Sequence, residues 1–262
     1  ETAPALYAGG SNAVGFHKST DFGVTWSDQL LPAAFGDYRY QQVYSVDVDP
    51  YDTDHILVAF HEAPDVAEST DGGTTWTKFA TPPEDGGSSY YPFFINTGDA
   101  GTTHETWLTI PQQNGDARAL RTTDGGTSWT KLGQFQHHHG SAQIFDAGSG
   151  LIYVAAMSPG GVHKSTDYGV TWASIYDGDG GVVTATPNFL YSSVGFGWGK
   201  VDAPLDPGLI TAPRNTDDTW SHVTPPAGMV DGAKRMAVTY DGAHHIVVAG
   251  SWHAGIWRYV EP

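Results

Sequence analysis

STDYGVTW, at residues 165–172, is one of four closely similar eight-residue strings in this 262-residue chain. The others are STDFGVTW at 19–26, STDGGTTW at 69–76 and TTDGGTSW at 122–129, and a degenerate copy, NTDDTW, occupies 215–220. Their aspartates are separated by 50, 53, 43 and 50 residues. A period of this length is typical of proteins built from a series of similar supersecondary units, so the strings predict a repeat architecture.

Each string holds the residues that a tight turn needs. The aspartate carboxylate and the Ser or Thr hydroxyl can hydrogen-bond nearby backbone N–H groups, and glycine permits a positive φ without steric cost. The tryptophan is large enough to pack between neighbouring sheets. The fifth copy lacks the glycine and is two residues short, which predicts a distorted turn. We therefore expect structural roles for the repeated aspartates Asp21, Asp71, Asp124, Asp167 and Asp217.

The string resembles the Asp-box, or BNR repeat, whose pattern is S/T-x-D-x-G-x-T/S-W. That repeat occurs in sialidases, xyloglucan-degrading enzymes, sortilin-type receptors and some lectins, where it forms the outer hairpin of a β-propeller blade. The resemblance therefore implies an all-β propeller of four-stranded antiparallel blades. It implies no single activity, because the repeat serves all of these proteins.

Short hydrophobic runs between Gly, Pro, Asp and Ser clusters favour the same all-β fold, and we expect one domain over residues 1–262. The runs suggest about five to six blades, or seven if the chain is a fragment of a larger ring. Residues 188–214 are irregular and could hide additional or missing strands, so no strand is named there. The expected first strands of the blades are 43–49, 92–97, 141–147, 182–187 and 235–241.

Composition excludes several classes of function. The net charge of −17, without a basic run, argues against binding to a nucleic-acid backbone. No apolar run of about 18 residues is present to cross a membrane. Cysteine is absent, so neither disulfides nor thiol chemistry is available, and the chain starts at Glu1 without Met, as after processing. We expect a secreted or periplasmic monomer.

The expected topology places the repeat turns at one end of each blade. The loops between second and third strands, and the connections between blades, then lie at the opposite end, around the mouth of the central channel. In the propellers that the repeat resembles, ligands usually bind at this mouth, and loops on a rigid scaffold often carry function. Unlike the turns, these mouth segments do not repeat, which favours a single asymmetric site over a multivalent lectin.

The mouth segments are rich in aromatic and basic residues. Aromatic rings can stack on sugar faces, and arginine can pair with carboxylates, so this composition suits an anionic or highly hydroxylated ligand. The alternative is that these are ordinary solvated loop residues. The candidate substrate-binding residues are Arg39, Tyr40, His61, Tyr90, Tyr91, His138, His139, Trp198, Lys200, Lys234, Arg235, Trp252 and His253.

Glycoside hydrolysis needs two carboxylates, and we take Glu62, Asp37 and Asp231 as the candidates. Glu62 follows a hydrophobic strand, so partial burial would raise its pKa, as a general acid requires. Asp37 and Asp231 lie near Arg39 and Lys234 in sequence, which favours their ionised form. The alternative for each is a solvated or turn-forming carboxylate.

Lyase chemistry on uronic acids is a second possibility, since it needs a base and a cation. Tyr40, Tyr91, the histidine run and Arg235 could supply these. The run 137–139 could also ligate a metal, but adjacent residues of a strand point to opposite faces, so at most two of its imidazoles converge. We expect neither metal nor cofactor.

The sequence thus favours a carbohydrate-active enzyme that cleaves a polysaccharide or oligosaccharide at one mouth site, as a glycosidase or a polysaccharide lyase. A non-catalytic carbohydrate-binding propeller and a protein-interaction propeller remain alternatives. Sialidase activity is not expected, because the chain has only six arginines and lacks the early Arg-Ile-Pro motif that accompanies this repeat in sialidases.

Overall fold

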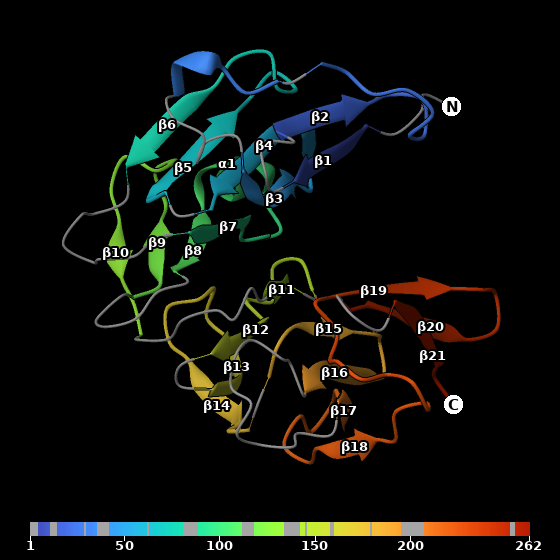
Figure 1. Ribbon diagram of the computed structural model, residues 1–262. Helices are drawn as coiled ribbons and strands as arrows, with labels where there is room; N and C mark the ends of the chain where they lie inside the picture. Colours follow the sequence, from blue (N-terminus) through green and yellow to red (C-terminus); the bar gives the residue numbers. More distant parts are fainter. Residues whose placement is uncertain are drawn as a thin grey trace. The chain divides into compact units, whose positions relative to one another are not determined.

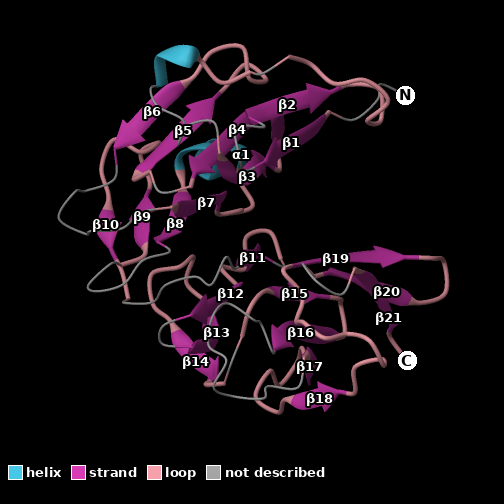
Figure 2. Ribbon diagram, in the orientation of Figure 1, coloured by secondary structure: helices cyan, strands magenta, loops and turns pink. Residues whose placement is uncertain are grey.

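The computed structural model describes residues 5–10, 15–28, 30–35, 42–61, 63–80, 89–111, 118–133, 142–144, 146–157, 160–178, 180–194, 207–251 and 255–262. This part of the chain is almost entirely β-structure (Figures 1 and 2). It divides into two compact units, Glu1–Gln134 with Ala147–Ser149, and Phe135–Asp146 with Gly150–Pro262. The expectation of a single domain over residues 1–262 stays a prediction.

Unit 1 contains a hairpin and two antiparallel sheets. The hairpin is β1 (Leu6–Gly10) with β2 (Gly15–Ser19), followed by a short 3-10 helix, Ala33–Phe35. The first sheet has, in order, β3 (Val43–Asp49), β4 (Asp52–Phe60), β5 (Asp65–Ser69) and β6 (Thr77–Ala80). The second has β7 (Tyr90–Phe94), β8 (Trp107–Pro111), β9 (Leu120–Thr122) and β10 (Thr130–Lys131), with the helix α1 (Ala100–Glu105) between β7 and β8.

Unit 2 contains three antiparallel sheets of the same kind. The first has β11 (Ala142–Ile144), β12 (Ile152–Met157), β13 (Gly160–Ser165) and β14 (Ala173–Tyr176). The second has β15 (Val183–Ala185), β16 (Phe189–Val194), β17 (Gly208–Pro213) and β18 (Ser221–Val223). The third has three strands, β19 (Arg235–Tyr240), β20 (His245–Gly250) and β21 (Ile256–Val260).

The expected all-β fold of four-stranded antiparallel sheets is confirmed. In every sheet each strand pairs with the next strand along the chain, and the expected first strands are β3, β7, β11, β15 and β19. Two strands, β16 and β17, fill the region in which the sequence analysis assigned none. First strands of consecutive sheets lie next to each other within a unit, β3 beside β7 and β15 beside both β11 and β19.

The hydrophobic cores lie between consecutive sheets. In unit 1, Leu57 and Val66 of one sheet pack with Trp107 and Leu120 of the next. In unit 2, Tyr153 and Val162 pack with Val183 and Leu190 of the following sheet in the same way. Burial of these side chains stabilises the packing of sheet on sheet, because each removes a large apolar area from water.

Four repeat turns share one hydrogen-bond pattern, shown by the turn at 69–76. The Thr75 backbone N–H and hydroxyl donate to the two carboxylate oxygens of Asp71, at 2.8 and 2.6 Å. The Ser69 hydroxyl donates to Asp71 at 2.9 Å and accepts from the Gly73 N–H at 2.8 Å. Side-chain and backbone hydrogen bonds from Thr75 lower the pKa of Asp71. The same contacts surround Asp21, Asp124 and Asp167.

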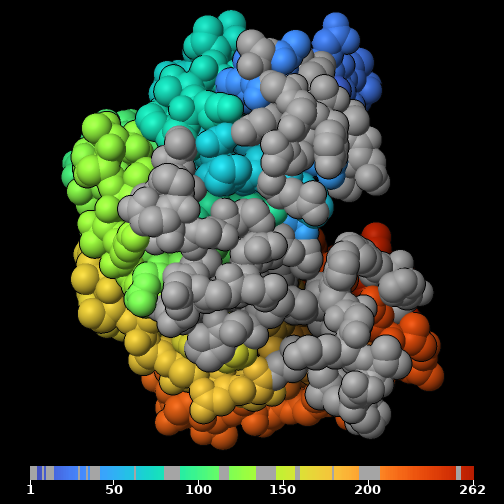
Figure 3. Space-filling model, turned by 60° about the vertical axis from the view of Figure 1, so that its left-hand side comes forward, coloured from blue at the N-terminus to red at the C-terminus, as the bar shows by residue number. Residues whose placement is uncertain are grey.

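The turns also demand two residues in the left-handed region. Glycine occupies the second of these positions in all four copies, and at Gly126 (φ 80°) a Cβ atom would stand 2.9 Å from the Trp107 ring. The first position, directly after the aspartate, holds glycine in two copies but Phe22 (φ 61°) and Tyr168 (φ 58°) in the others. Those two aromatic residues adopt an unfavourable backbone conformation that the turn imposes. Asp124 of the third turn is exposed. Figure 3 shows the surface of this part of unit 1 in green.

The fifth copy differs, as its shortened sequence predicts. Asp217 is buried at φ 43° and accepts hydrogen bonds from the Tyr153 hydroxyl at 2.7 Å and the Lys164 ammonium at 2.5 Å. Trp220 donates to the Ile175 carbonyl at 2.9 Å. In three of the complete copies, by contrast, the indole N–H of Trp26, Trp76 or Trp172 donates to the glycine carbonyl of its own turn. The fifth copy therefore ties its sheet to the preceding one.

Replacement of a turn aspartate should destabilise the fold in a pH-dependent way. Slight burial alone would raise the pKa of Asp167, but hydrogen bonds from Thr171 lower it below its usual value. Its stabilising contribution is therefore present above about pH 4 and is lost as the pH falls through the folded-state pKa. We expect Asp167→Asn to lower the free energy of unfolding by about 1–2 kcal/mol at pH 7 and by less at pH 3, in urea denaturation.

Thr166→Ala is the matched control, because the exposed neighbour Thr166 takes no part in these hydrogen bonds. An equal loss of stability at both pH values, or a loss no greater than that of the control, would contradict this role for Asp167.

Candidate functional site

Ten of the sequence-predicted site residues lie outside the described residues and stay predictions. They are Asp37, Arg39, Tyr40, Glu62, His138, His139, Trp198, Lys200, Trp252 and His253. The other six divide between the units, with His61, Tyr90 and Tyr91 in unit 1 and Asp231, Lys234 and Arg235 in unit 2.

The unit 1 residues lie at the end of the sheets opposite to the repeat turns. His61 directly follows β4, and its backbone N–H donates to the Gln42 carbonyl at 2.9 Å. The Tyr44 ring joins His61 (centroids 4.8 Å apart) to Tyr91 (5.5 Å). Sequence analysis had not singled out Tyr44. Tyr90, by contrast, is 0% exposed in the core, so its ring packs against other side chains and presents no face for a sugar.

The unit 2 residues surround the start of β19. Asp231 and Lys234 are buried, at 4% and 8% exposure, and the exposed Arg235 donates from Nη1 to the Lys234 carbonyl at 3.1 Å. The Lys234 N–H donates to the Gly250 carbonyl at 2.8 Å. Burial lowers the pKa of Lys234 to about 7, although Asp231 opposes this shift. Near pH 7, therefore, Lys234 is protonated in only part of the molecules, and the neutral amine of the others can accept a proton.

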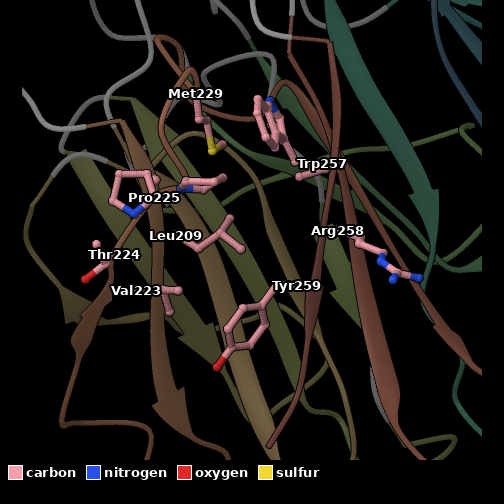
Figure 4. A pocket seen from close by; sticks show the side chains of 11 residues that line it. Leu209, Val223, Thr224, Pro225, Met229, Trp257, Arg258 and Tyr259 are labelled. Carbon is pink, nitrogen blue, oxygen red and sulfur yellow. The ribbon is translucent and has the colours of Figure 1, made fainter.

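Unit 2 also has an apolar hollow between β17, β18 and β21 (Figure 4). Leu209, Val223 and Met229 line it together with the rings of Trp257 and Tyr259. The indole N–H of Trp257 is buried and makes no hydrogen bond to the described residues. None of the predicted site residues lies in this hollow.

A cluster of carboxylate and imidazole side chains lies at the repeat-turn end of unit 1. It consists of Asp49 at the end of β3, His55 in β4, Glu68 in β5 and His104 in α1. The sequence analysis missed it. The available signal was weak, since only Asp49 and His55 are close in sequence, on either side of a tight turn.

No family model matches the sequence. Over 177 residues, 59% of this chain, the sequence is 25% identical to the curated xyloglucanase Xgh74A of Acetivibrio thermocellus, of which the match covers 20%. Two solved structures have a similar fold, each at 18% identity. An ancestral GH74 enzyme has a TM-score of 0.68 and covers 98% of this chain. The GH74 xyloglucanase of Xanthomonas campestris has a TM-score of 0.67 and covers 100%.

These likenesses establish the β-propeller fold. The five meander sheets are its blades, and the hairpin β1–β2 precedes them. The chain spans only 35% and 42% of the two GH74 structures. A structure of YCF48 bound to a D1 peptide is also similar, with a TM-score of 0.59 at 15% identity, and it covers 95% of this chain and 76% of that one. Among the described residues, no helix is long and apolar enough to span a membrane.

The buried amine predicts an unusual pH dependence of stability. Because the folded-state pKa of Lys234 is about 7 and the unfolded value is 10.5, the unfolded chain binds more protons between these values. The penalty for burying Lys234 is therefore largest below pH 7 and vanishes as the pH rises toward 10.5. We expect Lys234→Met to raise the free energy of unfolding at pH 6 by roughly 1–3 kcal/mol, and by much less at pH 9.5, in chemical denaturation.

The exposed Lys131 of β10 offers the control, since Lys131→Met removes a charge without removing a buried one. A gain for Lys234→Met that did not change with pH would show that the amine is not desolvated.

Proposed function

We propose that this chain is a carbohydrate-active propeller that cleaves a polysaccharide or oligosaccharide as a glycoside hydrolase. The observation that carries the proposal is the likeness of this chain to GH74 enzymes, whose structures cover 98–100% of it, together with its sequence match to a curated xyloglucanase. We assign the repeat turns to the Asp-box class, on their sequence and shared hydrogen bonds. Polysaccharides do not cross membranes, so such an enzyme would act outside the cytoplasm, as a secreted or periplasmic protein.

A xyloglucan-like neutral glucan is the substrate that the relatives favour. In unit 1, the partly exposed rings of Tyr44 and His61 suit a hydroxylated polymer, and they pack with the buried Tyr91. In unit 2, Arg235 is exposed. Rings of this kind offer apolar faces to sugars, and the guanidinium donates several hydrogen bonds. An anionic polysaccharide is the next substrate class, since Arg235 could also pair with a uronate.

Two carboxylates would perform the hydrolysis. We propose Glu62 as the general acid, and Asp37 and Asp231 as candidates for the base or nucleophile. Asp231 lies within the described residues and is buried. It is close to the amine of Lys234, which is partly neutral near pH 7. Burial at this place lowers the pKa of Lys234 to about 7, and shifts of this kind are common at catalytic sites.

A peptide-binding propeller is the second candidate. It rests on the likeness to YCF48, which was solved with a bound D1 peptide and covers 95% of this chain. That function would need an exposed apolar or charged surface for a polypeptide, and no carbohydrate would be cleaved. A lectin that binds sugar without cleaving it is the third candidate.

A polysaccharide panel separates these functions. We expect incubation with xyloglucan and related neutral glucans to release new reducing ends without the ultraviolet absorbance of unsaturated uronates. Both signals together on an acidic polymer would indicate a lyase instead. Release of neither, on any polymer, would contradict enzymatic cleavage, and glycan binding without cleavage would then indicate a lectin.

Replacement of the exposed Arg235 tests whether the mouth binds the polymer. Loss of a hydrogen bond from a charged donor costs about 1.5–3 kcal/mol, so we expect Arg235→Ala to lower kcat/KM on the cleaved polymer at least tenfold. Arg258→Ala is the matched control, because Arg258 is also exposed in unit 2 but lies on β21. Equal activity of the two variants would remove Arg235 from the site.

A further inference from the structure

Three side chains from three separate elements of unit 1 converge on one point. The His55 Nδ1 atom lies 3.3 Å from the Asp49 Oδ2 atom and 3.5 Å from the His104 Nδ1 atom. The His104 Nδ1 atom also contacts the Asp49 Oδ2 atom. All three potential ligand atoms thus lie within 4.8 Å of one another.

The local fold fixes this arrangement. The ladder between β3 and β4 is irregular just before Asp49, and the Tyr51 N–H donates to the second oxygen of that carboxylate at 2.7 Å, leaving Oδ2 to face the imidazoles. On the other side, Asp99 caps the start of α1, and the Trp107 indole N–H donates to the His104 carbonyl at 2.7 Å. The three groups are therefore held before any ligand arrives.

Burial and charge favour a cation at this point. The side chains of Asp49 and His55 are 0% and 6% exposed, and that of His104 is 34% exposed. Glu68 supplies a second carboxylate, whose Oε1 atom lies 2.8 Å from the His55 Nε2 atom.

We propose that Asp49, His55 and His104 bind one divalent transition-metal ion of the zinc class. Two imidazole nitrogens and one carboxylate oxygen are a donor set that zinc accepts, and ligand atoms about 2.0–2.1 Å from a tetrahedral ion stand roughly 3.3 Å apart. Two edges of the observed triangle, 3.3 and 3.5 Å, fit that geometry. A water on the partly exposed side of His104 would complete the coordination.

Glu68 strengthens the assignment. A metal-ligating histidine almost always donates its other ring N–H to a carboxylate or carbonyl, which fixes the tautomer. Here Glu68 accepts from Nε2 of His55, which leaves the lone pair of Nδ1 directed toward Asp49 and His104. The competing explanation is a protonated His55 between two carboxylates, and it requires no metal.

The bound ion would join two sheets of unit 1. Asp49 and His55 belong to the sheet β3–β6, whereas His104 lies in the connection between β7 and β8 of the next sheet. The site lies at the end of β4 opposite to His61, so it is separate from the proposed carbohydrate site in unit 1. The role of the ion is to stabilise the packing of the two sheets. This proposal does not depend on the proposed carbohydrate-cleaving activity.

Titration of the metal-stripped protein with zinc chloride tests the site. Calorimetry should show a single ion bound per chain, and saturating zinc should raise Tm by several degrees, because a ligand of the folded state stabilises it. His104→Gln should weaken zinc binding by about 100-fold or more, and Glu68→Gln by about 10-fold, while neither loses the fold in chelator. Replacement of zinc by Co²⁺ should give the visible absorption of a tetrahedral site.

Two control variants exclude other histidines. His222→Gln alters an exposed imidazole on β18, and the triple variant of His137, His138 and His139 to glutamine alters the histidine run. Both should bind zinc as the wild type does. The proposal is overturned if the wild type binds no zinc, if His104→Gln binds it equally well, or if only the triple variant loses it.

Discussion

The hydrogen bonds between one aspartate carboxylate and the Thr or Ser four residues later are the interactions on which the rest of the structure depends. In the turns around Asp21, Asp71, Asp124 and Asp167, both oxygens of the carboxylate are used, one by a backbone N–H and one by a hydroxyl. These bonds are charge-assisted and close each hairpin at the same place. Two of these turns end in tryptophans, Trp76 and Trp129, that pack against the hydrophobic cores of unit 1.

Much of the fold could be predicted because these turns are local. Every residue of the pattern lies within eight positions, so sequence alone places four hairpins and the strands beside them. The strands β16 and β17 were missed because the repeat copy that follows β17 is degenerate, and its Asp217 bonds Tyr153 and Lys164 of another sheet. Local pattern cannot disclose a contact that only the packed sheets create.

The candidate sites were harder to predict for the same reason. His55 and His104 are 49 residues apart and belong to consecutive sheets, so no spacing rule brings them together. Tyr90 was placed at the mouth by its position before a strand, yet all five residues of β7 are buried. Within unit 1 the two ends of the strands therefore differ in chemistry: aromatic groups gather around Tyr44 at one end, and the carboxylate–imidazole cluster lies at the other.

Native-state amide hydrogen exchange, resolved residue by residue, tests most directly whether the aspartate turns frame the fold. The backbone N–H groups of Thr25, Thr75, Ser128 and Thr171 are exposed in position yet bonded to carboxylates. The account predicts strong protection at these four amides, and loss of protection at Thr75 alone in Asp71→Ala. Exchange of all four as fast as the exposed neighbours Thr20 and Thr70 would contradict it.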